Sequence, residues 1–307
     1  MRILITGGSG FIGSHVAESF QGEAEVRVLD DLSTGRAENL AGLEVDFRKG
    51  SILDERALGE AAEGVDYVFH LAAMVSVPLS VGAPGACEAV NGLGVVKVLE
   101  AAAAAGVRKV FFASSAAVYG DNPLVPKTEG MLPEPKSPYA ITKLLGEHYC
   151  RFFHDEGRVA TAALRFFNVF GPRQDPGGAY AAAVPIFMEK ALRGEPITIY
   201  GDGEQTRDFI YVKDIVAAAR HVTLTEGLTG VRNAGYGGAL TVGELARRIV
   251  ALAGSRSEIR FLPERAGDVK HSRAAVEALA GTGFQPVSSL DEGLAATLAY
   301  FRGRLGV

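Results

Sequence analysis

The sequence predicts a doubly wound α/β protein, in which helices cover both faces of a parallel sheet, with a smaller C-terminal substrate-binding lobe. Apolar strand-like segments alternate with helical patterns through the first half of the 307 residues. A glycine-rich segment, 7–13, joins the first strand to the first helix. Beyond residue 171, Pro, Gly and short mixed segments replace this alternation. We therefore place one domain at 1–170 and a lobe at 171–307, with some segments of the lobe returning to the main sheet.

The amino terminus has the pattern of a strand, a tight turn and a helix. Residues 2–6 form an apolar run typical of a buried parallel strand, and a helical stretch continues through Phe20. Between them, Gly7 permits the turn, Gly10 lets the backbone approach a pyrophosphate, and Gly13 allows the helix to pack closely on the strand. The helix N-terminus then faces the anion. This order predicts a dinucleotide-binding (Rossmann) domain.

The next strand, 25–29, ends in two acidic residues. Asp30 and Asp31 lie about 20 residues beyond the central glycine, where a carboxylate accepts hydrogen bonds from the hydroxyls of the adenosine ribose. A carboxylate there repels a 2′-phosphate, so the sequence favours NAD over NADP. Arg36 is close enough in sequence to leave NADP open.

The later elements follow the same alternation. We expect strands at 65–71, 109–114 and 160–167, a long helix over 86–105, and a helix that carries residues 139–143. The carboxyl ends of these strands carry small or polar residues, and ligands bind at that edge in doubly wound sheets.

Tyr139 and Lys143 are the pair that indicates chemistry. Residues four apart on a helix lie one turn from each other on the same face. A lysine ammonium at that distance stabilises a phenolate and lowers the tyrosine pKa from its reference of about 10. The phenolate can remove a proton from an alcohol while a hydride leaves the same carbon. Because this spacing is common, the prediction depends on the nucleotide site at the amino terminus.

Composition excludes several classes. The formal net charge is −5 and no Lys/Arg cluster is present, so we expect no nucleic-acid partner. No apolar run reaches the ~20 residues that span a bilayer, and the first strand begins at residue 2, leaving no room for a signal peptide. The two cysteines, Cys87 and Cys150, are expected to be reduced in a cytoplasmic protein. The six histidines are scattered, so we expect no metal.

Several motifs in order give the chain a resemblance to a known family. Besides the glycine turn and 139–143, these are SSAAVYG at 114–120, RFFNVFGPR at 165–173 and GDGEQTRDF at 201–209. With them the sequence resembles the extended short-chain dehydrogenase/reductase family, and within it the sugar-nucleotide 4-epimerases acting on UDP-galactose and UDP-N-acetylglucosamine. The resemblance implies an NAD-dependent isomerase that oxidises and then reduces C4 of a UDP-sugar, and a homodimer.

The resemblance also implies roles for individual residues. The implied catalytic residues are Ser115, Tyr139 and Lys143. The implied cofactor-binding residues are Gly7, Gly10, Phe11, Ile12, Gly13, Asp30, Asp31, Leu32, Ser33, Gly35, Ser51, Ile52, Leu71, Ala72, Ala73, Asn91, Ser114, Tyr139, Lys143 and Phe167. The implied substrate-binding residues are Ser76, Ser115, Tyr139, Asn168, Ala183, Val184, Ile199, Tyr200, Arg207, Arg265, Asp268 and Ser272.

Neighbouring reactions in the family differ in the residues beside this core. Dehydratases and decarboxylases of the family carry acidic residues where this chain has Ala116 and Ala117, so epimerisation is the expected reaction. Ser272 falls where a bulky tyrosine restricts relatives to plain hexoses, and a serine there leaves room for an N-acetyl group. UDP-glucuronate 4-epimerisation ranks behind these because such enzymes tend to carry Thr in place of Asn168. A non-catalytic NAD-binding regulator is the alternative from another class.

Overall fold

The computed structural model describes residues 1–177, 182–264 and 270–307, and the chain divides into two compact units. Unit 1 comprises Met1–Gly120, Leu132–Phe166 and Val216–Arg232. Unit 2 comprises Asp121–Met131, Phe167–Ile215 and Asn233–Val307. Each unit is therefore built from separated stretches of chain. The predicted boundary at 170/171 falls inside unit 2, shortly after the chain leaves β6 of unit 1.

A seven-stranded sheet, counted over the described residues, has the order β11-β6-β5-β4-β1-β2-β3. From β6 to β3 every neighbouring pair is parallel, which is the strand order of a doubly wound nucleotide-binding sheet. The strands are β1 (Arg2–Thr6), β2 (Glu25–Asp30), β3 (Asp46–Lys49), β4 (Tyr67–His70), β5 (Lys109–Ser115), β6 (Ala160–Phe166) and β11 (Gly230–Ala234). The predicted fold class is confirmed.

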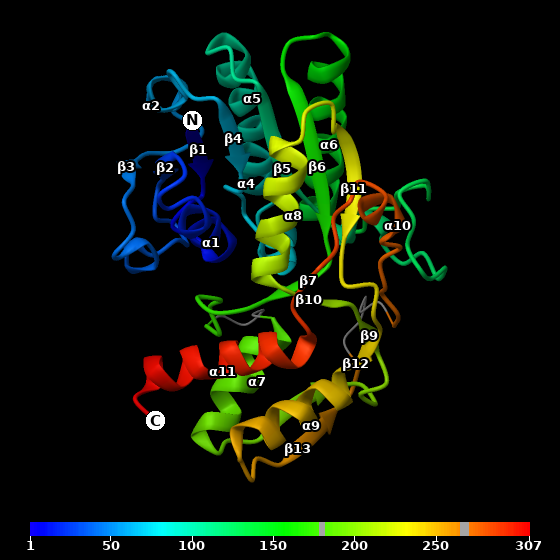
Figure 1. Ribbon diagram of the computed structural model, residues 1–307. Helices are drawn as coiled ribbons and strands as arrows, with labels where there is room; N and C mark the ends of the chain where they lie inside the picture. Colours follow the sequence, from blue (N-terminus) through cyan, green and yellow to red (C-terminus); the bar gives the residue numbers. More distant parts are fainter. Residues whose placement is uncertain (178–181, 265–269) are drawn as a thin grey trace. The chain divides into compact units, whose positions relative to one another are not determined.

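Helices cover both faces of this sheet (Figure 1). They are α1 (Phe11–Ser19), η1 (Ala37–Leu40), α2 (Glu55–Ala62), α3 (Val77–Gly82), α4 (Pro84–Cys87), η2 (Glu88–Leu93), α5 (Gly94–Ala104), η3 (Ala116–Tyr119), α6 (Pro138–Asp155) and α8 (Val212–Leu224). Because side chains of a strand alternate between faces, Phe112 of β5 packs with α5 and α6. Its neighbour Phe111 packs on the opposite face against Phe69, with the rings tilted and their centroids 5.8 Å apart, and Phe69 makes an edge contact with Phe20.

The predicted long helix at 86–105 forms, with a π-helical segment inside it. The chain forms α4, then a π-helical segment, η2, and only then α5. A π-turn is wider than an α-turn and is often found at functional sites. Here it carries Asn91, which is buried and makes hydrogen bonds to two other parts of unit 1, as described below.

Unit 2 is made of short strand pairs and helices. Its elements are β7 (Asn168–Phe170), α7 (Ala183–Arg193), β8 (Ile197–Tyr200), β9 (Thr206–Arg207), β10 (Phe209–Tyr211), β12 (Leu240–Thr241), α9 (Val242–Ala253), β13 (Ile259–Leu262), α10 (Glu277–Ala280) and α11 (Leu290–Leu305). Capping boxes at Thr241 and Ser289 start α9 and α11, since each hydroxyl accepts from a glutamate N–H three residues later and that glutamate returns the contact.

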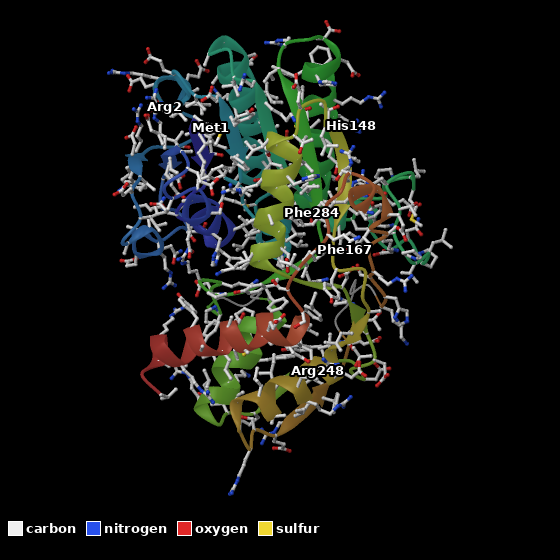
Figure 2. All side chains as sticks on the ribbon, viewed as in Figure 1. Met1, Arg2, His148, Phe167, Arg248 and Phe284 are labelled. Carbon is white, nitrogen blue, oxygen red and sulfur yellow. The ribbon has the colours of Figure 1, made fainter. Side chains whose placement is uncertain are left out.

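Exposed polar side chains are found on both units. His148 on α6 and Arg248 on α9 are exposed, each on its own unit (Figure 2). A search of the described residues finds no helix with the length and apolar character needed to cross a membrane. The same part of the chain contains no group of three or more His, Cys, Asp or Glu side chains placed to hold a metal ion.

Candidate active site

The glycine-rich turn at the end of β1 is closed by its own backbone. Gly7 has a φ of +73° and donates its N–H to the carbonyl oxygen of Leu29 at 2.9 Å. A Cβ on Gly7 would lie 2.6 Å from the backbone nitrogen of Ala72, and one on Gly13 would lie 2.2 Å from the Gly7 carbonyl oxygen. Side chains at these positions would therefore displace the turn, and α1 begins with its first N–H groups open to an anion. This backbone fits the pyrophosphate of a dinucleotide.

The two acids after β2 have different environments. Asp30 is buried, and its carboxylate accepts hydrogen bonds from the backbone N–H groups of Ser9 at 2.9 Å and Leu32 at 2.8 Å. Asp31 is exposed and accepts from the N–H of Ser33 at 2.9 Å. Asp30 thus ties the glycine turn to the following loop, in which Leu32 adopts a φ of +62°. The carboxylates lie where the sequence predicted them, beside the turn.

The segment after β4 is held by the π-helix. The Asn91 side-chain oxygen Oδ1 accepts from the N–H of Met74 at 2.8 Å, and the side-chain Nδ2 donates to the Met74 carbonyl oxygen at 3.0 Å. The same amide donates to Thr142 on α6 at 3.2 Å. Asn91 therefore fixes the half-buried stretch 71–73 and joins it to the helix that carries the predicted base. Elsewhere on this side, Ile52 is buried and Ser51 accepts from the Leu53 N–H.

Ser115, Tyr139 and Lys143 come together at the carboxyl end of β5. Ser137 caps α6, and the Tyr139 N–H donates to the Ser80 hydroxyl at 3.1 Å, so the first turn of the helix is fixed. The Tyr139 hydroxyl forms a hydrogen bond with the Ser115 side chain. The Lys143 ammonium lies 5.7 Å from the Tyr139 ring centroid. The predicted catalytic residues are thus neighbours within unit 1.

The ionisation of this group corrects one expectation. Burial raises the pKa of Tyr139 above its ordinary value, although the hydrogen bond from Ser115 opposes the shift. Burial also lowers the pKa of Lys143 to about 8. The sequence predicted a lowered tyrosine pKa from the lysine charge, but in the protein by itself desolvation is the largest effect on Tyr139 and acts in the opposite direction. Positive charge beside the phenol would favour its ionised form.

Three residues of this region were missed by the sequence prediction. His70, at the end of β4, is buried with its Nδ1 atom 2.7 Å from the Thr6 hydroxyl, and burial lowers its pKa to about 3. Glu147 and Arg165 form a buried ion pair next to Ser114, whose hydroxyl donates to Glu147 at 2.5 Å. The available signal for Glu147 was its spacing, because Tyr139, Lys143 and Glu147 recur every four residues.

The predicted substrate residues divide between the units. Ser76 caps α3 in unit 1, with its hydroxyl accepting from the Leu79 N–H. In unit 2, Asn168 donates its side-chain amide to the Asp208 carbonyl oxygen at 3.1 Å. Arg207 donates to the Thr206 carbonyl oxygen at 2.9 Å.

The remaining predicted residues lie in unit 2 or outside the residues that the structure describes. Phe167 is buried and donates its N–H to the Ala234 carbonyl oxygen. Ser272 donates its N–H to the Thr206 carbonyl oxygen at 3.2 Å, and Arg207 donates to the same oxygen. Ala183 and Val184 begin α7, and Ile199 and Tyr200 end β8. Two further predicted residues, Arg265 and Asp268, lie outside the described residues.

A nucleotide-binding turn, a doubly wound sheet and a Ser-Tyr-Lys group on one unit define a short-chain dehydrogenase/reductase. Residues 3–233 match the model of the "NAD dependent epimerase/dehydratase family". The chain belongs to this family, so NAD is its cofactor, as the sequence predicted.

Individual relatives match over nearly their whole length. A UDP-glucose 4-epimerase of Mycolicibacterium smegmatis is 40% identical, with 99% of each chain covered. The structure of a UDP-glucose 4-epimerase with UDP-glucose from Thermotoga maritima has a TM-score of 0.95 and 41% identity, covering 99% of this chain and 100% of that one. A UDP-N-acetylglucosamine 4-epimerase from Methanobrevibacter ruminantium in complex with UDP-N-acetylmuramic acid has a TM-score of 0.95 and 39% identity, with coverages of 99% and 98%.

Proposed function

We propose that the protein is an NAD-dependent 4-epimerase of UDP-hexoses, interconverting UDP-glucose and UDP-galactose and also their N-acetylated counterparts. The observation that carries the proposal is the placement of Ser115, Tyr139 and Lys143 at the carboxyl end of β5. Such a group moves one proton at a time and needs no further acid. Relatives whose printed names are UDP-sugar 4-epimerases support the choice of substrate.

The residues of unit 1 fit NAD. The glycine turn leaves backbone N–H groups for the pyrophosphate, and Asp31 offers an exposed carboxylate for the ribose hydroxyls. When bound, NAD supplies the acceptor and then the donor of the hydride at C4 of the sugar. The positive charge of oxidised NAD would add to that of Lys143 in favouring the phenolate form of Tyr139.

The chain's own residues handle the proton. Tyr139, as phenolate, accepts the proton of the sugar O4 hydroxyl, while the Ser115 hydroxyl orients that oxygen. Lys143 keeps a cation beside the phenolate. After the 4-keto sugar has turned its other face to the site, Tyr139 returns the proton and the configuration at C4 is inverted. The rotation requires a firmly held diphosphate, the role we assign to Arg207, Arg265 and Asn168.

Two features favour epimerisation and a wide substrate range. Ala116 and Ala117, at the start of η3, offer no group that could eliminate water or a carboxylate. Ser272 is a small residue at the position proposed to gate the sugar. UDP-glucuronate remains the second candidate substrate, and a non-catalytic NAD-binding regulator remains the alternative class. We further propose that the protein is cytoplasmic and forms a homodimer. Sedimentation of the purified protein tests the dimer.

The test is turnover of purified protein with UDP-glucose, UDP-N-acetylglucosamine and UDP-glucuronate, each followed by NMR. We expect conversion of the first two, and a loss of at least ~100-fold in kcat for Tyr139→Phe with NAD still bound. Tyr149→Phe makes the same change elsewhere on α6 and is expected to keep full activity. Undiminished turnover by Tyr139→Phe would refute the catalytic assignment. Conversion of glucose without the N-acetyl sugar would refute the wide pocket.

A further inference from the structure

Consecutive residues at the end of β5 each contact a different turn of α6. Ser115 meets the Tyr139 hydroxyl, as described above. Ser114, one residue earlier, donates its hydroxyl to the Glu147 carboxylate at 2.5 Å. Lys143 lies between them on α6 and donates to the backbone of the same strand. Glu147 therefore anchors the helix one turn beyond Lys143, on the face that carries the active group.

Glu147 is itself held from β6. Arg165 donates from Nε to Glu147 Oε1 at 2.9 Å and from Nη2 to Oε2 at 2.7 Å, so the pair is bidentate. Only 6% of the Arg165 side chain and 5% of the Glu147 side chain are exposed. Arg165 is paired in register with Ser114 across the two strands, and its guanidinium lies 4.8 Å from the Tyr119 ring centroid. These two parallel hydrogen bonds from the Arg165 guanidinium, here called the fork, thus join β6 to α6, and Ser114 joins them to β5.

The charges of this pair matter because both side chains are buried. A carboxylate one helical turn from Lys143 would, if uncompensated, hold the proton on that lysine and oppose the ionisation of Tyr139. The two hydrogen bonds from Arg165 balance it. The pair therefore anchors α6 without adding net charge beside Tyr139.

Other ionisable side chains interact with the pair or with Lys143. Cys150 on α6 and Tyr119 on η3 interact with the pair, and Cys87 on α4 and His70 on β4 interact with Lys143. Burial raises the pKa of the Cys150 thiol, and it lowers the pKa of His70 to about 3, so neither carries charge near neutral pH. The Glu147–Arg165 pair is therefore the place where a single substitution would leave a buried, unbalanced charge one helical turn from Lys143.

We propose that Glu147 and Arg165 are positioning residues for the proposed epimerisation, setting the register of α6 against β5 and, through their mutual charge balance, the ionisation of Tyr139. The inference rests on the proposed function for its role in catalysis. Neither residue needs to touch the substrate. Both act through the placement of Tyr139 and Lys143.

The experiment compares Glu147→Gln, Arg165→Met and the double variant, all as full-length protein with NAD. The pKa of Tyr139 is measured from the near-ultraviolet absorbance of its phenolate, taking the difference from a Tyr139→Phe background, and the pH profile of kcat is measured in parallel. We expect Glu147→Gln to lower this pKa and Arg165→Met to raise it, each by about one unit, and the double variant to return it to the wild-type value. Arg151→Met, which breaks an exposed ion pair on the same helix, serves as the matched control and is expected to change neither quantity.

The outcomes separate the two proposals. Folded single variants with an unmoved Tyr139 pKa would overturn the positioning role. A different result would be a Tyr139 pKa that shifts in opposite directions in the two single variants while the wild-type protein converts no UDP-sugar. That result would leave the positioning role standing and reject the proposed function. If the single variants do not fold, Arg165→Lys decides, since it keeps the charge and loses the fork. A kcat reduced at least ~10-fold with an unchanged pKa supports positioning by the fork, and a wild-type kcat overturns it.

Discussion

The Lys143 ammonium donates a hydrogen bond to the carbonyl oxygen of Ala113 at 2.8 Å. It also lies 5.1 Å from the ring centroid of Phe112, the preceding residue of β5. A flexible lysine is thereby fixed against the strand that leads to Ser115. Because the ammonium is buried there, it holds its proton less firmly than an exposed lysine does, and the pKa of Lys143 falls to about 8.

This relationship sets the pH dependence expected for turnover. The pKa of Tyr139 is raised by burial, so the phenolate fraction, and with it kcat, should increase about tenfold per pH unit on the acidic side. The rise should flatten near pH 8, where Lys143 loses the charge that stabilises the phenolate. Measuring kcat across this range with saturating UDP-glucose checks the expectation. A pH-independent kcat would show that Tyr139 is not the base.

His70 should make the protein lose stability in mild acid. Its pKa is about 3 in the folded protein against an ordinary 6.5, so the unfolded chain binds the proton first as the pH falls. Its contribution is complete above pH 6.5 and is lost as the pH falls from there towards 3. Between neutral pH and pH 5 the loss is about 2 kcal/mol.

The matched variant for this effect is His70→Gln, which keeps a partner for the Thr6 hydroxyl and cannot titrate. Urea unfolding of both proteins at several pH values isolates the histidine. The difference in free energy of unfolding between wild type and variant should shrink as the pH falls. A constant difference would contradict the buried, neutral histidine.

Two glycines in helices of unit 1 should respond oppositely to alanine. A Cβ on Gly13 would lie 2.2 Å from the Gly7 carbonyl oxygen and 2.7 Å from the Gly8 Cα, both backbone atoms of the nucleotide turn. Gly13→Ala is expected to cost about 1–3 kcal/mol and to weaken NAD binding. Gly59, inside α2, has no atom within 4 Å of its Cβ position, so Gly59→Ala should stabilise by about 0.5–1 kcal/mol. Urea unfolding and NAD titration distinguish them, and equal effects would refute the close packing.

Asp208 should stabilise the fold of unit 2. Its buried carboxylate accepts from the N–H groups of Tyr236 at 2.8 Å, Gly237 at 3.0 Å and Ala274 at 3.0 Å. Burial raises the pKa of Asp208, and these hydrogen bonds oppose that shift. Asp208→Asn replaces one acceptor with a donor, and we expect a loss of about 1–3 kcal/mol.

The Asp208 variant should also affect the substrate, because Asn168 and Arg207 are attached to the same stretch. KM for the UDP-sugar is expected to rise more than kcat falls. Asp291→Asn, an exposed residue of α11, is the control and should change stability by less than about 0.5 kcal/mol. A neutral Asp208→Asn would show that the carboxylate is not needed to hold these loops.

Much of the nucleotide site was predictable because its signals are local. The turn from Gly7 to Gly13 depends on backbone freedom within a few residues, and the spacing of Tyr139 and Lys143 follows from helical geometry. The π-helical segment inside the helix at 86–105 was not predictable in this way. It carries Asn91, whose partners Met74 and Thr142 come from distant parts of the chain.

The sequence by itself thus determined the alternation of strands and helices in the nucleotide half, its glycine turn, and the grouping of Ser115, Tyr139 and Lys143. Tertiary structure alone decided the pairing of Glu147 with Arg165, the neutral state of His70 and the raised pKa of Tyr139. The reason is physical. Desolvation and charge balance depend on which side chains surround a group after folding, and those neighbours lie far away along the chain.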